Sequence, residues 1–161
     1  MLLLCLVEDL RNAPLPRPII TAVPKVLLAA ARTSPSVKLG VSRSQVALNY
    51  AVLAKLGVPE SAIETFGNEL SSTFEESMAL RGWAERHRAM RIIVPTEVFS
   101  SRRVKWMMER ALSGTRTQVR VPALESYEYR RDEWWRKEQG LIAFQNELIK
   151  YVYYRVRYRT N

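Results

Sequence analysis

The chain has 161 residues, which is long enough for one domain with a buried core and short for two. Its 47% hydrophobic and 25% charged residues exclude a disordered or low-complexity chain, and its single cysteine excludes an internal disulfide. The net charge of +9 favours partners that carry phosphate, such as a small molecule, a membrane surface or a nucleic acid, without choosing among them.

The first residues, MLLLCLVEDL, are apolar as far as Val7 and then acidic at Glu8 and Asp9. This run is far shorter than the roughly 20 residues that span a bilayer. It also lacks the basic start and the cleavage site of a secretory signal. We therefore expect no signal peptide and no transmembrane helix in this chain, and a cytoplasmic or membrane-associated location. Residues 12–24 carry four prolines, so we predict an irregular segment over residues 1–24.

From residue 25 onward, short apolar segments alternate with longer amphipathic ones. Ser42 with Gln45, and Ser72 with Glu75, fit capping boxes at the starts of two helices. The predicted strands cover residues 25–30, 62–66, 91–95 and 117–122. The predicted helices cover residues 42–59, 71–87, 101–112 and 135–158.

Strands that alternate with helices over short connections pair in parallel, and the helices then cover the faces of the sheet. We therefore predict an α/β fold with a mostly parallel sheet of about four to five strands. Residues 1–161 form a single domain, in which residues 25–122 are the strand–helix core and residues 123–161 are a loop and a C-terminal helix.

In such a sheet, the loops that follow the strands emerge at one edge, and ligands bind there. Two of these loops, residues 67–73 and 96–101, bring hydroxyl groups to the start of a predicted helix. Unpaired N–H groups and the helix dipole favour an anion at such a position. Serine and threonine also cap helices that bind no ligand, so both explanations remain open.

Arg102 and Arg103 lie in the first turn of a predicted helix, where a cation is disfavoured by about 0.3–1 kcal/mol. A bound anion would reverse the sign of that interaction. Alternatively, both side chains turn away from the helix start and pair with Glu97 or another acid, or face water. The sequence favours neither explanation over the other.

The other residues capable of chemistry favour structural roles. His87 is the only histidine and lies near a predicted helix end, so we expect no metal site. The chain has no nucleophile elbow and no glycine-rich phosphate loop. We expect Trp134 and Trp135 to pack the terminal helix onto the sheet. The apolar stripe of that helix is predicted to run through three tyrosines, Tyr151, Tyr154 and Tyr158.

Three segments within residues 56–158 resemble a known family: LGVPESAIETF with SSTFEES, then RIIVPTEVFSSRRVKWMMERAL, then WWRKEQGLIAFQNELIKYVYYRVRY. In order and spacing they resemble the domain of unknown function 218 family, the group that includes YdcF, SanA and ElyC. This resemblance implies a Rossmann-like three-layer α/β/α fold with a polar pocket at the carboxyl ends of the strands. It also implies bacterial cell-envelope and peptidoglycan-related processes, and S-adenosylmethionine or another nucleotide-like ligand in one branch.

The resemblance places one family motif on residues 72–77 and a second on residues 96–103. It implies ligand binding by six side chains, Ser72, Thr73, Thr96, Ser100, Arg102 and Arg103. It gives Glu76 the role of a catalytic acid or base, if the protein is an enzyme. There are departures: Ser100 stands where the family has a histidine, Ala29–Ala31 replaces a glycine turn, and the first strand with its Gly-rich loop has no counterpart before Lys25.

We therefore expect a protein that binds an anionic or nucleotide-like small molecule at the carboxyl-terminal edge of its strands, in bacterial cell-envelope biogenesis. Whether it is an enzyme stays open. One alternative is a non-catalytic interaction module with a degenerate pocket. A nucleic-acid binder, suggested by the net charge and by the basic aromatic tail, is the alternative that we expect least. An anionic membrane surface is a further partner class.

Overall fold

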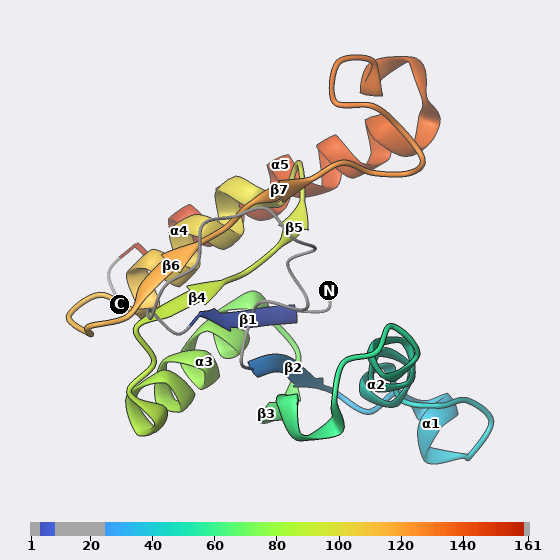
Figure 1. Ribbon diagram of the computed structural model, residues 1–161. Coiled ribbons are helices and arrows are strands. Elements are labelled where there is room, and N and C mark those ends of the chain that lie inside the picture. The colour runs from blue at the N-terminus through green and yellow to red at the C-terminus, as the bar shows by residue number, and fades with distance from the viewer. Residues whose placement is uncertain (1–3, 9–24, 160–161) are drawn as a thin grey trace.

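The computed structural model describes residues 4–8 and 25–159, which form a mixed α/β fold (Figure 1). The strands are β1 (Leu4–Glu8), β2 (Lys25–Ala31), β3 (Ile63–Leu70), β4 (Arg91–Ile93), β5 (Thr96–Glu97), β6 (Gln118–Arg120) and β7 (Ala123–Leu124). The helices are α1 (Pro35–Lys38), α2 (Gln45–Lys55), α3 (Thr73–His87), α4 (Ser101–Ala111) and α5 (Glu138–Arg157).

Five strands form one sheet in the order β3-β2-β1-β4-β6 (Figure 1). β2 and β3 are parallel, as are β4 and β6, but β1 lies between the two pairs and is antiparallel to both of its neighbours. The predicted α/β class is confirmed, whereas the mostly parallel sheet is present only as two parallel pairs.

The prediction that residues 1–24 are irregular is wrong for Leu4–Glu8, which form β1. An apolar run of this length is typical of a strand that has neighbours on both sides. A strand therefore precedes Lys25, but residues 1–24 contain no glycine, so the family's Gly-rich loop has no counterpart there. The proline-rich residues 12–24 lie outside the described residues.

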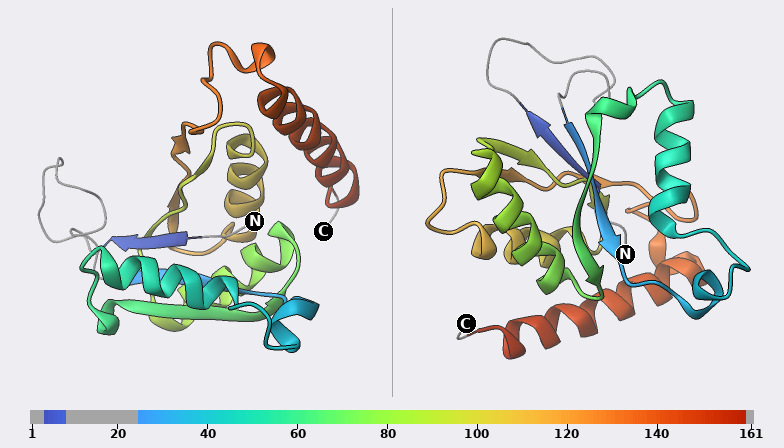
Figure 2. Two further views of the ribbon diagram at one scale, coloured as in Figure 1. Left: turned by 90° about the vertical axis from the view of Figure 1, so that its right-hand side faces the viewer. Right: turned by 90° about the horizontal axis from the view of Figure 1, so that it is seen from below.

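β2 has helices over both of its faces (Figure 2). Leu27 and Ala29 belong to the larger core cluster, which β2 shares with α3 and α4. Val26 and Leu28 point the other way and pack with Leu53 of α2. Full burial of each such leucine stabilises the fold by about 1.5–3 kcal/mol. This strand is therefore the rigid support from which the neighbouring loops extend.

Two prolines explain why the last predicted strands are shorter than expected. Pro95 and Pro122 have no N–H to donate, so each interrupts its strand. β4 ends at Ile93 and β6 at Arg120, and the pairing resumes as the two-stranded parallel sheet of β5 and β7. This continuation carries the chain past the main sheet and into the start of α4.

The helix starts agree with the sequence only in part. Ser72 caps α3 as predicted, because its Oγ accepts a hydrogen bond from the Glu75 N–H at 3.2 Å. α2 begins later than predicted, since its N-cap is Ser44, not Ser42. The predicted helix 135–158 begins with a 3-10 turn at Trp134–Arg136, and α5 itself starts at Glu138.

α5 packs along α4, on the side away from β2 (Figure 2). Its inner side carries the predicted tyrosine stripe, of which Tyr154 is buried and Tyr151 and Tyr158 are half-buried. Trp134 does not reach the sheet as expected, since it stacks on Phe144 of α5 with ring centroids 4.3 Å apart. None of the helices in the described ranges combines the length and the apolarity needed to cross a bilayer.

Candidate functional site

The candidate site lies at the start of α3, where the chain leaves β3. A cavity of about 360 Å³ opens there, within the usual size range of small-molecule sites. Its lining comes from the ends of β2 and β3, the first turns of α3 and α4, and α5: Ala31, Leu70, Ser71, Ser72, Thr73, Glu76, Arg103, Lys150, Tyr153 and Tyr154. Four of the seven predicted site residues, Ser72, Thr73, Glu76 and Arg103, therefore meet in one cavity.

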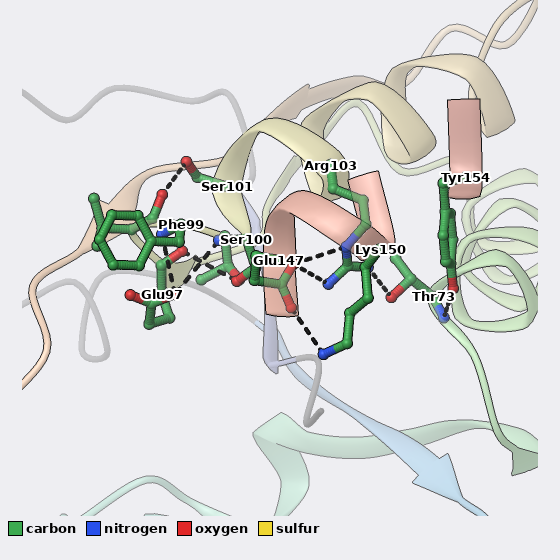
Figure 3. A network of polar contacts seen from close by, with 11 residues as sticks. Thr73, Glu97, Phe99, Ser100, Ser101, Arg103, Glu147, Lys150 and Tyr154 are labelled. Carbon is green, nitrogen blue, oxygen red and sulfur yellow. Dashed lines mark hydrogen bonds and ion pairs between the residues drawn. The ribbon is translucent and has the colours of Figure 1, made fainter. Parts of the chain in front are cut away.

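Arg103 is buried and connects three helices (Figure 3). Its Nε and Nη2 atoms lie 2.9 and 2.8 Å from Oε2 of Glu147 on α5. Its Nη1 donates a hydrogen bond to Oγ1 of Thr73 on α3 at 2.7 Å. Arg103 is thus already neutralised by a carboxylate, as in the alternative explanation of the arginine pair.

Glu147 is shared between two cations. While its Oε2 faces Arg103, its Oε1 accepts a hydrogen bond from Lys150 Nζ at 2.9 Å (Figure 3). Two positive charges therefore surround one negative charge beside the cavity. Lys150 is about half exposed, so water weakens its share of this field more than that of Arg103.

The first turn of α3 is tied to α5 by Tyr154. The Thr73 N–H, which has no partner within the helix, donates to the Tyr154 hydroxyl at 3.1 Å. The Ser71 N–H and hydroxyl group both donate to Oε2 of Glu75, at 2.6 and 2.8 Å. The chain itself therefore satisfies much of the hydrogen-bonding capacity that an anion was expected to use at this helix start.

Glu76 is the least satisfied group in the cavity. It is 4% exposed, and its Oε2 atom has no hydrogen-bond partner. Burial raises the pKa of this carboxyl from 4.5 to about 7, and the opposing charge of Arg103 lowers it by less. At neutral pH the carboxyl group therefore exists in both forms, so it can either donate or accept a proton.

Just before the start of α4, a carboxylate of the chain accepts backbone N–H groups. Oε2 of Glu97 accepts hydrogen bonds from the N–H groups of Phe99 and Ser100, at 3.0 and 3.4 Å (Figure 3). Its Oε1 accepts the hydroxyl of Tyr129 at 2.6 Å. Burial, together with this contact, raises the pKa of Tyr129 well above its ordinary value. Glu97 therefore provides a negative charge beside the helix start at which an external anion was expected, while binding of an external anion there stays a prediction.

The remaining predicted site residues lie elsewhere. Thr96 and Ser100 are buried, with their hydroxyl oxygens 3.0 Å apart, and neither lines the cavity at α3. Arg102 is exposed and lines a second cavity of about 320 Å³. That cavity is mainly apolar and aromatic, with the lining Val98, Phe99, Ser101, Arg102, Arg131, Trp134, Phe144, Glu147, Leu148 and Tyr151. The two adjacent arginines thus face different cavities and do not form one receptor.

Sequence reasoning missed the contribution of α5 to the site. Glu147, Lys150 and Tyr154 are spaced three and four residues apart, so they share one side of the helix. The sequence feature that could have indicated this contribution is Glu147, because it is an acidic residue among the apolar positions on the inner side of α5. Which other helix this side contacts depends on tertiary packing, which no local pattern reveals.

The chain was compared with protein-family models, with curated proteins and with solved structures, and no match was found.

Proposed function

We propose that the protein binds a small anionic molecule, one that carries a phosphate or carboxylate group, in the cavity between α3 and α5. The observation that supports this proposal best is Glu76, which lines the cavity together with Arg103 and Lys150 and whose buried Oε2 has no hydrogen-bond partner. A buried polar atom without a partner loses stabilisation of about 1–3 kcal/mol. A ligand that hydrogen-bonds to Oε2 would recover part of that loss.

The charges around the cavity favour an anion when Glu76 is protonated. Arg103 and Lys150 carry two positive charges, and Glu147 cancels one of them. With a neutral Glu76 the group has one net positive charge, and with an ionised Glu76 it has none. Anion binding is therefore coupled to uptake of a proton by Glu76, and the affinity falls as the pH rises through about 7.

Glu76 is also the group that would carry out proton transfer, if the protein is an enzyme. Its protonated form donates a hydrogen bond to a ligand oxygen, and its ionised form removes a proton from a ligand hydroxyl. The hydroxyl groups of Ser72 and Tyr153 line the same cavity and supply further polar contacts. Binding is the core of this proposal, and catalysis is an extension of it.

The residues suit some of the expected cofactors better than others. A phosphate group matches the cationic side chains, so the phosphate end of a nucleotide-like ligand fits. The sulfonium of S-adenosylmethionine brings a positive charge toward Arg103 and Lys150, so this cofactor does not fit as well. In addition, the Cβ atom of Ala31 stands in the lining where a glycine would let a phosphate approach the backbone.

We also propose that the chain is a divergent relative of the domain of unknown function 218 family, with a Rossmann-like three-layer origin and a role in the bacterial cell envelope. Two observations support this. Ser72 and Glu76 of the first family motif line the same cavity as Arg103 of the second. Helices also pack on both faces of β2. The antiparallel β1 is the main departure from that architecture.

Isothermal titration calorimetry tests the proposed binding, with sulfate as the first probe because its charge does not change between pH 6 and 8. Phosphate, a nucleoside monophosphate and S-adenosylmethionine complete the panel. We expect sulfate to bind more tightly at pH 6 than at pH 8 in the wild-type protein. Glu76→Gln should remove this pH dependence, because glutamine stays neutral. Lys150→Gln should weaken binding roughly tenfold.

Arg102→Gln is the matched control, since it removes a neighbouring arginine that faces the other cavity. It should leave sulfate binding unchanged. The proposal fails if none of the four probes binds, or if Arg102→Gln weakens binding as much as Lys150→Gln does.

The alternative function is a non-catalytic interaction module. The observation that favours it is the segment just before α4, where Glu97 accepts the Phe99 N–H and Ser100 is buried. A module of this kind would bind none of the small anions at either pH. The calorimetric panel therefore distinguishes the two functions directly.

A further inference from the structure

The outward side of α5 is mainly apolar, with the polar Gln145 among its exposed side chains. Seven apolar side chains on this side are about half exposed or more, with exposed fractions of 48% to 75%. We call these seven side chains the outer stripe: Leu141, Ile142, Leu148, Ile149, Val152, Tyr153 and Val156. A helix that is apolar on both its inner and outer sides normally has neighbours on both. In the part of the chain that the structure describes, α4 covers only the inner side (Figure 2).

The shape of the outer stripe suits a flat surface. At 3.6 residues per turn, the stripe covers an arc of about 140° and extends about 22 Å along the helix. A coiled-coil seam uses only two positions in seven and is narrower. The stripe is therefore wider than the seam that a single partner helix would cover. A lipid bilayer adapts to a convex helix.

The charges beside the outer stripe are positive. By the same helical geometry, Arg155 lies on one margin, and Lys150 and Arg157 lie on the other. The acidic residues of α5 are Glu138, at its first position, and Glu147, which faces inward to Arg103. A second copy of this chain would bring like charges against these margins. An anionic surface would bring opposite ones.

A basic cavity opens at the C-terminal end of the stripe. Its volume is about 570 Å³, and its lining is Trp106, Arg110, Arg155, Val156 and Arg159. Val156 belongs to the outer stripe, so the cavity and the stripe are continuous. The Arg155 guanidinium lies over the Trp106 ring, 5.1 Å from its centroid, which fixes its position. Arginine is the side chain best suited to bind phosphate with two parallel hydrogen bonds.

We propose that α5 docks the protein on an anionic phospholipid surface. The outer stripe enters the boundary between headgroups and acyl chains, and the arginine cavity receives a lipid phosphate. In the part of the chain that the structure describes, the lining of this cavity contains no carboxylate that would repel such a group. Because Lys150 and Tyr153 also line the cavity at α3, a docked protein would hold its proposed ligand site close to the membrane.

Co-sedimentation with vesicles tests this proposal on the full chain. Vesicles of phosphatidylcholine alone are compared with vesicles that also contain phosphatidylglycerol. We expect the protein to sediment only with the anionic vesicles, and less as the salt concentration rises. Ile149→Asp places a charge in the centre of the stripe and should reduce partitioning roughly tenfold. Arg159→Gln should reduce it by a smaller factor.

Val52→Asp on α2 is the matched control, because Val52 is 57% exposed and Ile149 is 61% exposed. It should sediment like the wild-type protein, and both aspartate variants should keep wild-type circular dichroism and sulfate binding. The proposal is overturned if the protein stays in solution with anionic vesicles, or if Ile149→Asp still sediments with them. A third outcome would also overturn it: light scattering shows a dimer that Ile149→Asp dissociates, and neither the wild-type protein nor any variant binds vesicles.

Discussion

Arg103 on α4 and Glu147 on α5 form a buried ion pair, with 2.8 Å between Nη2 and Oε2 and side chains that are 3% and 12% exposed. This pair lies between the two cavities, since Arg103 lines the cavity at α3 and Glu147 lines the other. It explains one of the two arginines at this helix start. Arg103 joins three helices, whereas Arg102 is exposed and lines the other cavity.

The ion pair predicts a large difference between neighbouring arginines. Arg103→Gln leaves Glu147 partly buried without its main partner, so we expect a loss of about 3–5 kcal/mol in the free energy of unfolding. Arg102→Gln should change it by less than about 0.5 kcal/mol, because the side chain is exposed. Urea denaturation measures both. Equal losses in the two variants would show that Arg103 is not the structural member of the pair.

The hydrogen bond between Tyr154 and the start of α3 gives a second prediction. Tyr154→Phe removes the hydroxyl that accepts the Thr73 N–H, so we expect a loss of about 1–2 kcal/mol in the free energy of unfolding. Tyr153→Phe is the control, since Tyr153 is 56% exposed and lines the same cavity. Thermal unfolding of both variants provides the comparison. Equal stabilities of the two variants would show that this hydrogen bond does not stabilise the fold.

Glu97 gives a third prediction, at the start of α4. The Glu97 carboxylate accepts hydrogen bonds from the Phe99 N–H and the Tyr129 hydroxyl. Glu97→Gln removes its negative charge, so we expect a loss of about 2 kcal/mol in the free energy of unfolding. The pKa of Tyr129 should fall toward its ordinary value, which ultraviolet titration measures. Glu109→Gln, at an exposed ion pair with Lys105, should change neither quantity. An unchanged titration of Tyr129 in Glu97→Gln would contradict the assigned contact.

Local patterns in the sequence are enough to predict the elements that carry their own signals. α3 and α4 follow from apolar periodicity and hydroxyl residues at their starts, and β2 follows from its apolar run. The apolar run of β1 is a local signal for a strand, but its antiparallel position between two parallel pairs depends on contacts far apart in the sequence. The predicted lengths of β4 and β6 were too great because Pro95 and Pro122 interrupt the hydrogen bonding between these strands.

Apart from Arg103, the candidate site was predictable only on its α3 side. Ser72, Thr73 and Glu76 lie in a loop and helix start that an α/β sheet places at its ligand edge. The pairing of Arg103 with Glu147 could not be predicted, because the two residues are 44 positions apart and meet only when α4 packs on α5. A helix start also does not indicate whether its anion comes from a ligand or from the chain, as Glu97 shows.

Glu76 predicts a specific dependence of stability on pH. Below pH 4.5 the carboxyl is protonated in both the folded and the unfolded chain, so it contributes nothing. Between pH 4.5 and about 7 only the folded chain keeps the proton, so the free energy of unfolding falls as the pH rises. Above that range the loss is constant at about 3 kcal/mol.

Glu76→Gln does not titrate at this position and therefore isolates the effect. The stability of the variant relative to the wild-type protein should increase by about 3 kcal/mol between pH 4.5 and pH 8. Urea denaturation at several pH values measures this difference. A difference that stays constant with pH would mean that Glu76 has an ordinary pKa.

The central claim is that Glu76 takes up a proton when an anion binds beside it. Carbon-13 NMR of the side-chain carboxyl groups, with Glu76→Gln to assign the signal, follows its titration with and without saturating sulfate. We predict a midpoint near pH 7 in the free protein, which sulfate raises further because binding and protonation are linked. A midpoint that is the same with and without sulfate, or one near pH 4.5, would contradict the claim.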